Sequence, residues 1–196
     1  MKKVILLFLL SASVTLFSQN SVFKLELNYP IPVDQNFIGK NYTGIIDIGG
    51  KYSLLNKDIV SLGFAFNTGL LTFDNSENII FQNYRVSAYS FQPKVFCEFN
   101  IKSIDKLHPY TSLGYSFMIF KATGTNNEFD ISDLNDTQNG INLNFGIAFD
   151  ITKKFFINAQ YDFIKLKKEN SIPYSTFNTN INLVKLGIGL KLYQKE

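Results

Sequence analysis

Two ten-residue segments near the C-terminus constrain the fold more than any other feature of this chain. INLNFGIAFD (Ile141 to Asp150) and FFINAQYDFI (Phe155 to Ile164) alternate large apolar residues with small or polar ones. A strand has a side-chain period of two, and a tilted strand needs about 9–11 residues to cross the hydrocarbon of a membrane. The short connection through Thr152, Lys153 and Lys154 makes them one hairpin. The pair therefore predicts part of a transmembrane β-barrel.

The same period-two pattern occurs eight times, and no segment of useful length after residue 18 shows a helical stripe of apolar residues. The eight predicted strands cover about 23–29, 43–54, 59–73, 84–99, 109–123, 141–150, 155–164 and 180–193. In the last of these the alternation changes phase between Leu183 and Val184, which predicts a β-bulge. The fold class is all-β, as an eight-stranded antiparallel up-and-down barrel.

The lengths of the connections alternate along the chain. Residues 56–58, 103–108 and 152–154 form short links, whereas 31–40, 74–83, 124–139 and 167–179 form long ones. Short periplasmic turns that alternate with longer outer loops are typical of an even-numbered outer-membrane barrel. A soluble meander has no reason to sort its loops in this way.

The composition of the two strand faces separates a membrane barrel from a soluble one. The polar face is rich in Gly, Ala and Ser, whereas the other face consists of bulky Leu, Ile, Phe and Tyr. Small residues suit the crowded inside of an eight-stranded barrel, and lipid accommodates bulky apolar ones. A soluble periplasmic barrel of the lipocalin kind, with its apolar face inward around a ligand, is the alternative.

The first eighteen residues have the features of a cleaved export signal. Lys2 and Lys3 precede an apolar run, Val4 to Phe17, that is short for a membrane-spanning helix. We expect a signal peptide at 1–18 and one barrel domain at 19–196 in the bacterial outer membrane. Without the two lysines the formal net charge falls from +3 to +1, which gives no reason to expect nucleic-acid binding. The single cysteine, Cys97, allows no intramolecular disulfide.

Three segments resemble strands of a known family. They are HPYTSLGYSF (108–117), GINLNFGIAFDITKKFFINAQYDFIKLK (140–167) and NINLVKLGIGLKL (180–192). Their pattern of glycines and aromatic residues is similar to that of small outer-membrane β-barrels, the OmpA-, OmpX- and OmpW-like or porin-family proteins of Bacteroidetes type. The resemblance implies the architecture and the cell envelope as location, with the barrel-assembly machinery as a partner. It does not imply a particular activity.

Ten charged residues fall on the inward face, five of them lysines and five acids. They are Lys24, Glu26, Asp47, Lys51, Lys94, Glu98, Asp150, Asp162, Lys185 and Lys191. Side chains nearly fill an eight-stranded barrel, and an unpaired buried charge is costly, so we expect ion pairs that close the lumen and no polar pore. Asp162 and Lys185 should pair, or share a network with Lys94 and Glu26.

Sites for chemistry are scarce. The single histidine, His108, falls at a predicted periplasmic turn, and no metalloprotease, Walker or dinucleotide motif is present, so no enzyme and no cofactor are expected. The loop acids Glu128, Asp130, Asp133 and Asp136 lack the EF-hand spacing, so no metal site is expected either.

Lysines at the end of the seventh predicted strand suggest a contact with lipid. Lys165, Lys167 and Lys168 could touch lipopolysaccharide phosphates or extend toward the membrane interface. Cys97 lies on the predicted lipid face as a structural thiol. We expect a non-enzymatic barrel that presents outer loops for surface interaction or envelope integrity, with an extracellular partner that the sequence leaves unknown. An OmpW-like conduit for a small apolar solute is the second alternative.

Overall fold

The computed structural model describes residues 23–75, 82–126, 129–130, 134–167 and 175–193. The predicted signal peptide lies outside the described residues. The strands are β1 (Phe23–Val33), β2 (Thr43–Asn56), β3 (Val60–Asn75), β4 (Gln82–Phe99), β5 (Leu107–Asn126), β6 (Phe129–Asp130), β7 (Asn135–Asp150), β8 (Phe155–Leu166) and β9 (Asn180–Tyr193). Two short helices, α2 (Phe37–Asn41) and α3 (Thr176–Thr179), follow β1 and precede β9.

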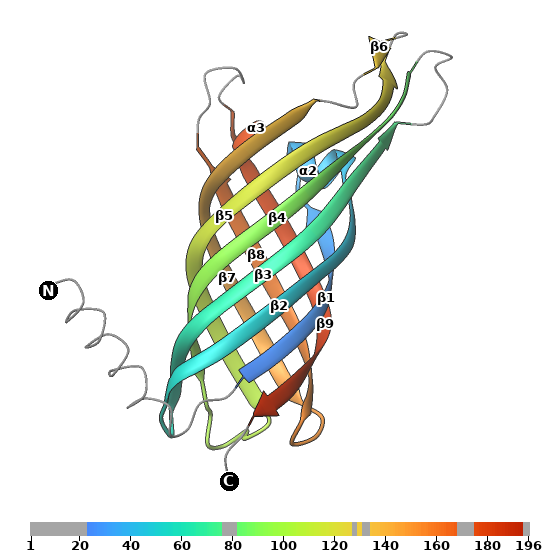
Figure 1. Cartoon of the computed structure of the whole chain (residues 1–196). Coiled ribbons are helices and arrows are strands. Elements are labelled where there is room, and N and C mark those ends of the chain that lie inside the picture. Colours follow the sequence, from blue (N-terminus) through green and yellow to red (C-terminus); the bar gives the residue numbers. More distant parts are fainter. Residues whose placement is uncertain (1–22, 76–81, 127–128, 131–133, 168–174, 194–196) are drawn as a thin grey trace, which may run out of the picture.

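Eight strands close into one antiparallel barrel, as predicted (Figure 1). Each long strand pairs with its neighbours along the chain, and pairing of β1 with β9 closes the ring. β6 is a two-residue addition that pairs only with the outer end of β5. Closure satisfies the backbone hydrogen bonds of the strands without leaving an open edge, which a chain in lipid requires.

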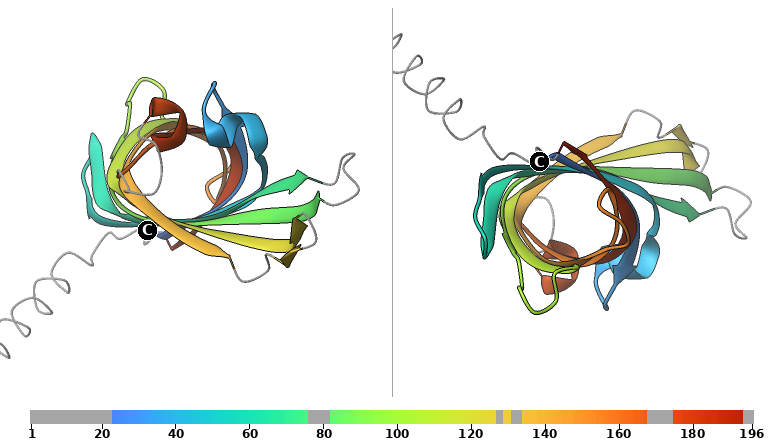
Figure 2. Two further views of the ribbon diagram at one scale, coloured as in Figure 1. Left: turned by 90° about the horizontal axis from the view of Figure 1, so that it is seen from above. Right: turned by 90° about the horizontal axis from the view of Figure 1, so that it is seen from below.

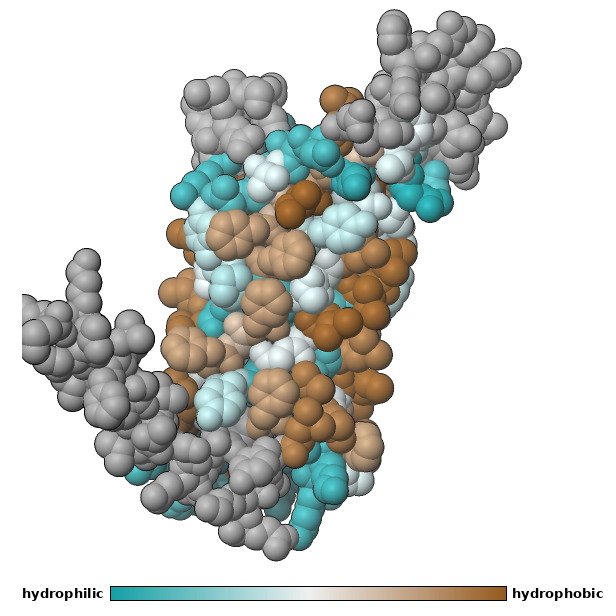
Figure 3. All heavy atoms as spheres, viewed as in Figure 1, coloured by the Kyte–Doolittle hydropathy of each residue, from teal (hydrophilic) through white to brown (hydrophobic). Residues whose placement is uncertain are grey.

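Large apolar side chains cover the outside of the barrel. On β7 they run from Ile141, 58% exposed, through Phe145 to Phe149, a length of about 9 residues that matches a tilted membrane-spanning strand. On the face that the space-filling view shows, apolar residues lie over the middle of the molecule, with hydrophilic residues toward both ends (Figure 3). Lysines and carboxylates are instead buried inside. This is the reverse of a soluble barrel, so the lipocalin-like alternative is wrong.

Several strands are longer than predicted at the end with the long links. The predicted loop 124–139 is largely strand, because β5 continues to Asn126 and β7 starts at Asn135. β3, β4 and β5 also rise well above the rest of the barrel (Figure 1). The residues in these extensions are mostly polar, so they lack the alternation of apolar residues that predicts a membrane strand.

The predicted bulge between Leu183 and Val184 is wrong. β9 pairs with β8 and with β1 without a shift at this point, and Leu183 lies inside the barrel like Lys185. The inside of the barrel is apolar at this depth. The inward Leu183 therefore interrupts the alternation of polar and apolar residues without any change in strand register. Register shifts occur elsewhere, in β2 at Gly44/Ile46 and at Ser53/Leu55.

Glycines on the inward face make room for two rings. A Cβ at Gly146 would lie 2.4 Å from the Tyr110 ring, and one at Gly189 would lie 2.0 Å from the Phe156 ring. Tyr110, Ala148 and Phe156 form a buried inner cluster. The small residues of the polar face therefore leave room for large side chains of the paired residues on the neighbouring strands inside a narrow barrel.

The two short helices lie at the mouth of the barrel at its long-link end (Figure 2). Asn36 caps α2, since its side chain accepts a hydrogen bond from Gly39 N at 2.7 Å. Asp34, which has a positive φ of 78°, accepts a bond from Asn182 and so ties the turn before α2 to β9. In the part of the chain that the structure describes, no helix is long and apolar enough to cross a membrane.

Candidate functional site

A network of four charges crosses the middle of the lumen; we call it the central charge network. Lys185 Nζ lies 2.7 Å from Asp47 Oδ2 and 2.6 Å from Asp162 Oδ2. Lys94 Nζ adds a third contact, 3.3 Å from Asp162 Oδ1. All four side chains are almost completely buried, so the attraction between them is screened far less than at a surface. Two lysines and two aspartates leave the network formally neutral.

Amide side chains complete the bonding of the two aspartates. Asn28 and Asn67 both donate to Asp47 Oδ1, at 3.0 and 2.9 Å. Asn144 Nδ2 donates to Asp162 Oδ1 and also lies 2.9 Å from Gln160 Oε1. Buried ion pairs are favourable only when such hydrogen bonds satisfy the remaining lone pairs. The charges of this network were predictable from the strand alternation, whereas the amides that bond to them were not predicted.

Two further ion pairs lie toward the short-turn end. Lys24 contacts both carboxylate oxygens of Glu98, and Lys51 Nζ lies 2.7 Å from Glu26 Oε1. The Lys51 ammonium also sits 3.4 Å from the centre of the Tyr110 ring, a cation–π contact. Glu26 thus belongs to this second layer, and Asp162 pairs with Lys185 and Lys94 without it.

A third group of charges lies at the rim of the same end. Asp150 Oδ2 is 2.5 Å from Lys191 Nζ and 3.1 Å from His108 Nε2, while His108 Nδ1 lies 3.1 Å from Asn100 Oδ1. All ten charged residues on the predicted inward face therefore lie on the lumen side and form these three groups. The histidine joins the end of β7 to the start of β5.

An outer apolar layer, which was not predicted from the sequence, lies inside the opposite end of the barrel. It consists of Ile38, Tyr42, Leu71, Ala88, Met118, Ile164, Leu166, Ile181 and Leu183. α2 contributes Ile38, which is 2% exposed, and the strands contribute inward side chains such as Met118, which is completely buried. Ile164 and Leu166 occupy the same alternate positions of β8 as the inward Asp162, and this spacing was the signal that could have revealed the layer.

Comparison with known proteins identifies the architecture. The sequence model of the family described as outer membrane protein beta-barrel domain matches residues 4–191, nearly the whole chain. The chain belongs to this family of outer-membrane β-barrels. A comparison with curated proteins gives no significant match.

Solved structures with the same fold are known from several bacteria. The attachment invasion locus protein Ail of Yersinia pestis, in complex with the heparin analogue sucrose octasulfate, is similar with a TM-score of 0.56 and 14% identity, over 88% of this chain and 98% of Ail. Neisserial surface protein A is similar with a TM-score of 0.56 and 15% identity, over 88% of this chain and 97% of that protein. The N-terminal β-barrel domain of Pseudomonas aeruginosa OprF has a TM-score of 0.54 and 18% identity, over 89% of this chain and 98% of that domain. At these identities the likeness shows the fold alone.

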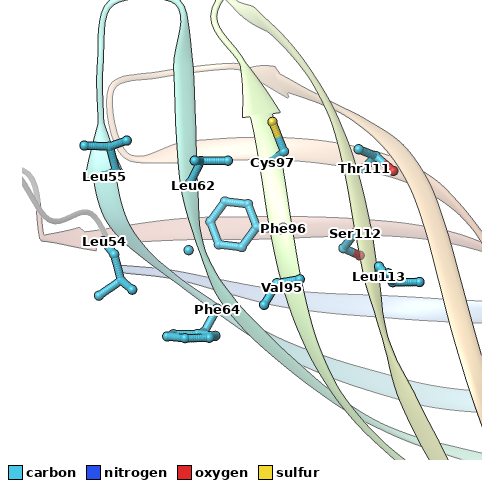
Figure 4. A pocket seen from close by; sticks show the side chains of 11 residues that line it. Leu54, Leu55, Leu62, Phe64, Val95, Phe96, Cys97, Thr111, Ser112 and Leu113 are labelled. Carbon is cyan, nitrogen blue, oxygen red and sulfur yellow. The ribbon is translucent and has the colours of Figure 1, made fainter. Parts of the chain in front are cut away.

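The outer surface of this outer-membrane barrel carries an apolar furrow of about 560 Å³ across β2, β3, β4 and β5. Figure 4 shows its lining, in which Cys97 lies between Leu62 and Thr111, next to a row formed by Phe64, Val95 and Leu113. The furrow lies within the apolar band, so lipid chains cover it in a membrane. Cys97 is only partly exposed and faces this furrow, on the side of the barrel predicted for it.

The lysines proposed for lipid contact differ in their surroundings. Lys165 Nζ lies 3.0 Å from Thr179 Oγ1 and 2.6 Å from Asn180 Oδ1, which holds it against the start of β9. Lys167 is exposed, with its ammonium 5.2 Å from the centre of the Tyr115 ring. Lys168 lies outside the described residues. Lys167 therefore has the most freedom of the described pair to meet a phosphate.

Of the predicted acidic loop, Glu128 and Asp133 lie outside the described residues, and Asp136 is on β7. Among the described residues no group of three His, Cys, Asp or Glu side chains is arranged to hold a metal ion.

Proposed function

We propose that this protein is a non-enzymatic outer-membrane barrel whose lumen is closed by its own side chains and whose outer end makes surface contacts. One observation carries the proposal. The central charge network and the outer apolar layer lie inside the same lumen at two successive depths, and both are almost completely buried.

The two closures oppose a permeating ion in different ways. An ion at the depth of Lys185 would have to separate partners 2.6–2.7 Å apart, and breaking a buried pair costs about 3–5 kcal/mol. An ion at the depth of Met118 would lose water among apolar side chains, which is also costly. Passage requires both steps, which supports a closed barrel.

The charged groups of the lumen support a structural role and not catalysis. Asp162 and Lys185 are fully engaged with one another and with neighbours, out of contact with solvent. His108 contacts Asn100 and Asp150, neither of which is a nucleophile that an imidazole base could activate. The outer end, with α2, α3 and the raised strands, is the part available to partners.

Conductance in planar bilayers tests the closed lumen. The wild-type protein should show no stable openings at neutral pH. Leu71→Ala with Met118→Ala should stay silent because the charge network remains, whereas adding Lys185→Ala should produce openings. Leu113→Ala on the lipid face is the control, and heat-modifiable gel migration verifies that each variant is folded. Stable openings of the wild type overturn the proposal.

A conduit for a small apolar solute remains the second candidate function. The outer apolar layer favours it, because an apolar solute could enter where an ion could not. Uptake of a radiolabelled apolar solute into cells with and without the protein tests this function. Faster uptake that Met118→Trp abolishes would support the conduit over the closed barrel.

We also propose contact between Lys167 and phosphate groups of lipopolysaccharide in the outer leaflet. Its exposure at the outer end of β8 supports this. Lys167→Gln should weaken stabilisation of the barrel by lipopolysaccharide by about 1 kcal/mol, and not its stabilisation by uncharged detergent. Equal stabilisation of both proteins by lipopolysaccharide would remove Lys167 from this role.

Export by a signal peptide at 1–18 and insertion by the barrel-assembly machinery, leaving a mature barrel domain at 19–196, complete the proposal. The family match supports this route. The intact mass of the protein purified from outer membranes tests the cleavage position, and loss of the folded form on depletion of the machinery tests the insertion.

A further inference from the structure

We propose that the outer mouth of the barrel is a binding site for a small organic ammonium ion with an apolar body. A cavity of about 380 Å³ lies there, and we call it the mouth cavity. This volume is within the range of about 300–1,000 Å³ typical of small-molecule sites. Its lining consists of Phe37, Ile38, Tyr42, Val86, Phe120, Asp136, Gln138, Leu166 and Asn178.

Most of the wall of the mouth cavity is apolar and well ordered by packing. Ile38 and Leu166 are nearly fully buried and belong to the outer apolar layer, so the floor of the cavity is also the roof of the closed lumen. Tyr42 packs edge-to-face against Phe37 and Phe120, with ring centres 5.8 and 6.2 Å apart. An apolar body that enters gains contact with rings already held in place.

The polar part of the wall specifies the charge of the ligand. Asp136 is the one charged side chain among the described residues that line the cavity, and Gln138 Nε2 donates to its Oδ2 at 2.8 Å. Burial raises the pKa of Tyr42 to about 12, so this phenol adds no negative charge. Aromatic faces also attract cations. A carboxylate and aromatic rings around one cavity favour an ammonium group and disfavour an anion.

Lys40 does not cancel this preference. Its ammonium lies 5.9 Å from the centre of the Phe177 ring, and Lys40 is not part of the cavity wall. The mouth cavity ends at the outer apolar layer, so the site captures a ligand without requiring passage. The inference therefore goes beyond the proposed function and does not depend on whether the lumen conducts.

The test uses three probes of one shape and different charge on the full-length protein in bilayer nanodiscs. Benzylammonium, benzyl alcohol and benzoate are titrated while methyl resonances are followed by NMR. Ile38 and Leu166 methyls should shift saturably with benzylammonium, less with benzyl alcohol and least with benzoate. Ile157 and Ile188 methyls, on the lipid face, report partition of a probe into the bilayer.

Two variants locate the site. Asp136→Asn should raise the Kd for benzylammonium about threefold, as expected for an exposed carboxylate, and leave the Kd for benzyl alcohol unchanged. Asp74→Asn, which removes an equal charge from an exposed pair with Arg85, should change neither Kd. Val86→Trp should fill the cavity and abolish saturable binding; Phe120→Trp serves if that variant does not fold.

Three outcomes overturn the proposal. Binding of benzoate as tight as that of benzylammonium removes the charge preference. Equal shifts of Ile157 and Ile188 assign the signal to the bilayer. Saturable binding that survives in a folded Val86→Trp or Phe120→Trp variant places the probe elsewhere.

Discussion

Buried amides on one strand differ in how well they are bonded. Asn142 and Asn144 are both inward on β7 and are 0% and 1% exposed. Asn144 donates to Asp162 and Gln160, whereas neither polar atom of Asn142 has a hydrogen-bond partner among the described residues. A buried polar group without a partner carries a desolvation cost that nothing offsets.

Replacement by leucine should therefore affect the free energy of unfolding differently at the two positions. Asn144→Leu should lower the free energy of unfolding by about 2 kcal/mol, because it strips a bond from a buried carboxylate. Asn142→Leu should be neutral or stabilising. Reversible urea unfolding in lipid vesicles measures both, and equal losses at the two positions would show that Asn142 is as well bonded as Asn144.

Because Asp162 contacts both Lys94 and Lys185, its replacement should destabilise the barrel more than the joint replacement of Asp162 and Lys94. Asp162→Asn leaves Lys94 buried without a carboxylate and should cost about 3–5 kcal/mol of unfolding free energy. Adding Lys94→Met should recover part of that loss, because Lys185 and Asp47 remain as a matched pair.

The exposed pair of Arg85 with Asp74 is the control for this comparison. Arg85→Met should cost less than about 1 kcal/mol, as exposed ion pairs usually do. The same unfolding assay applies. A double variant less stable than Asp162→Asn alone would mean that Lys94 does not depend on Asp162.

At the scale of the element, β7 changes its environment along its length. Its outward residues are apolar from Ile141 to Phe149 and polar from Asn135 to Asn139. Spin labels on 135–165 should show oxygen accessibility at odd positions from 141 onward, and accessibility to a water-soluble nickel complex at odd positions before it. Oxygen accessibility at even positions would contradict the assigned faces.

Substitution at Phe145 measures the same face by energy. Phe145→Arg should cost about 2–4 kcal/mol of unfolding free energy, because a cation then lies near the bilayer midplane. Phe145→Leu should be nearly silent, because lipid demands no particular shape. A large loss with leucine would instead indicate a packed protein contact at this position.

How far an element could be predicted depended on whether its pattern was repeated. Strands such as 141–150 were predictable because their alternation persists for a full membrane crossing. The outer ends of β5 and β7 were not, because polar residues paired above the membrane have no periodic signal. The inward charges were identified by parity alone, whereas their partners depend on register between distant strands, as with Lys24 and Glu98. α2 at the mouth was missed because five residues carry too little helical signal.

At the scale of the whole molecule, the single cysteine reports the folded state. Cys97 lies in the lipid-facing furrow, so a bulky, membrane-impermeant maleimide should not label it in intact membranes. Unfolding in urea should make labelling complete. A variant with Cys97→Ser and Thr123→Cys, at an exposed position on the outer end of β5, should label before unfolding and serves as the control. Rapid labelling of the folded wild type would place Cys97 outside the bilayer.

Directional access follows from the unequal height of the barrel wall. β3, β4 and β5 rise beyond the mouth in one direction, whereas α2 and α3 lie lower, at the mouth itself (Figures 1 and 2). A large partner that approaches from the tall side meets strand backbone before it meets the opening. Among the described residues, a small solute can pass beside the raised strands and reach the mouth, whereas a large partner first contacts β3, β4 and β5, so the uneven wall selects by size and by angle of approach.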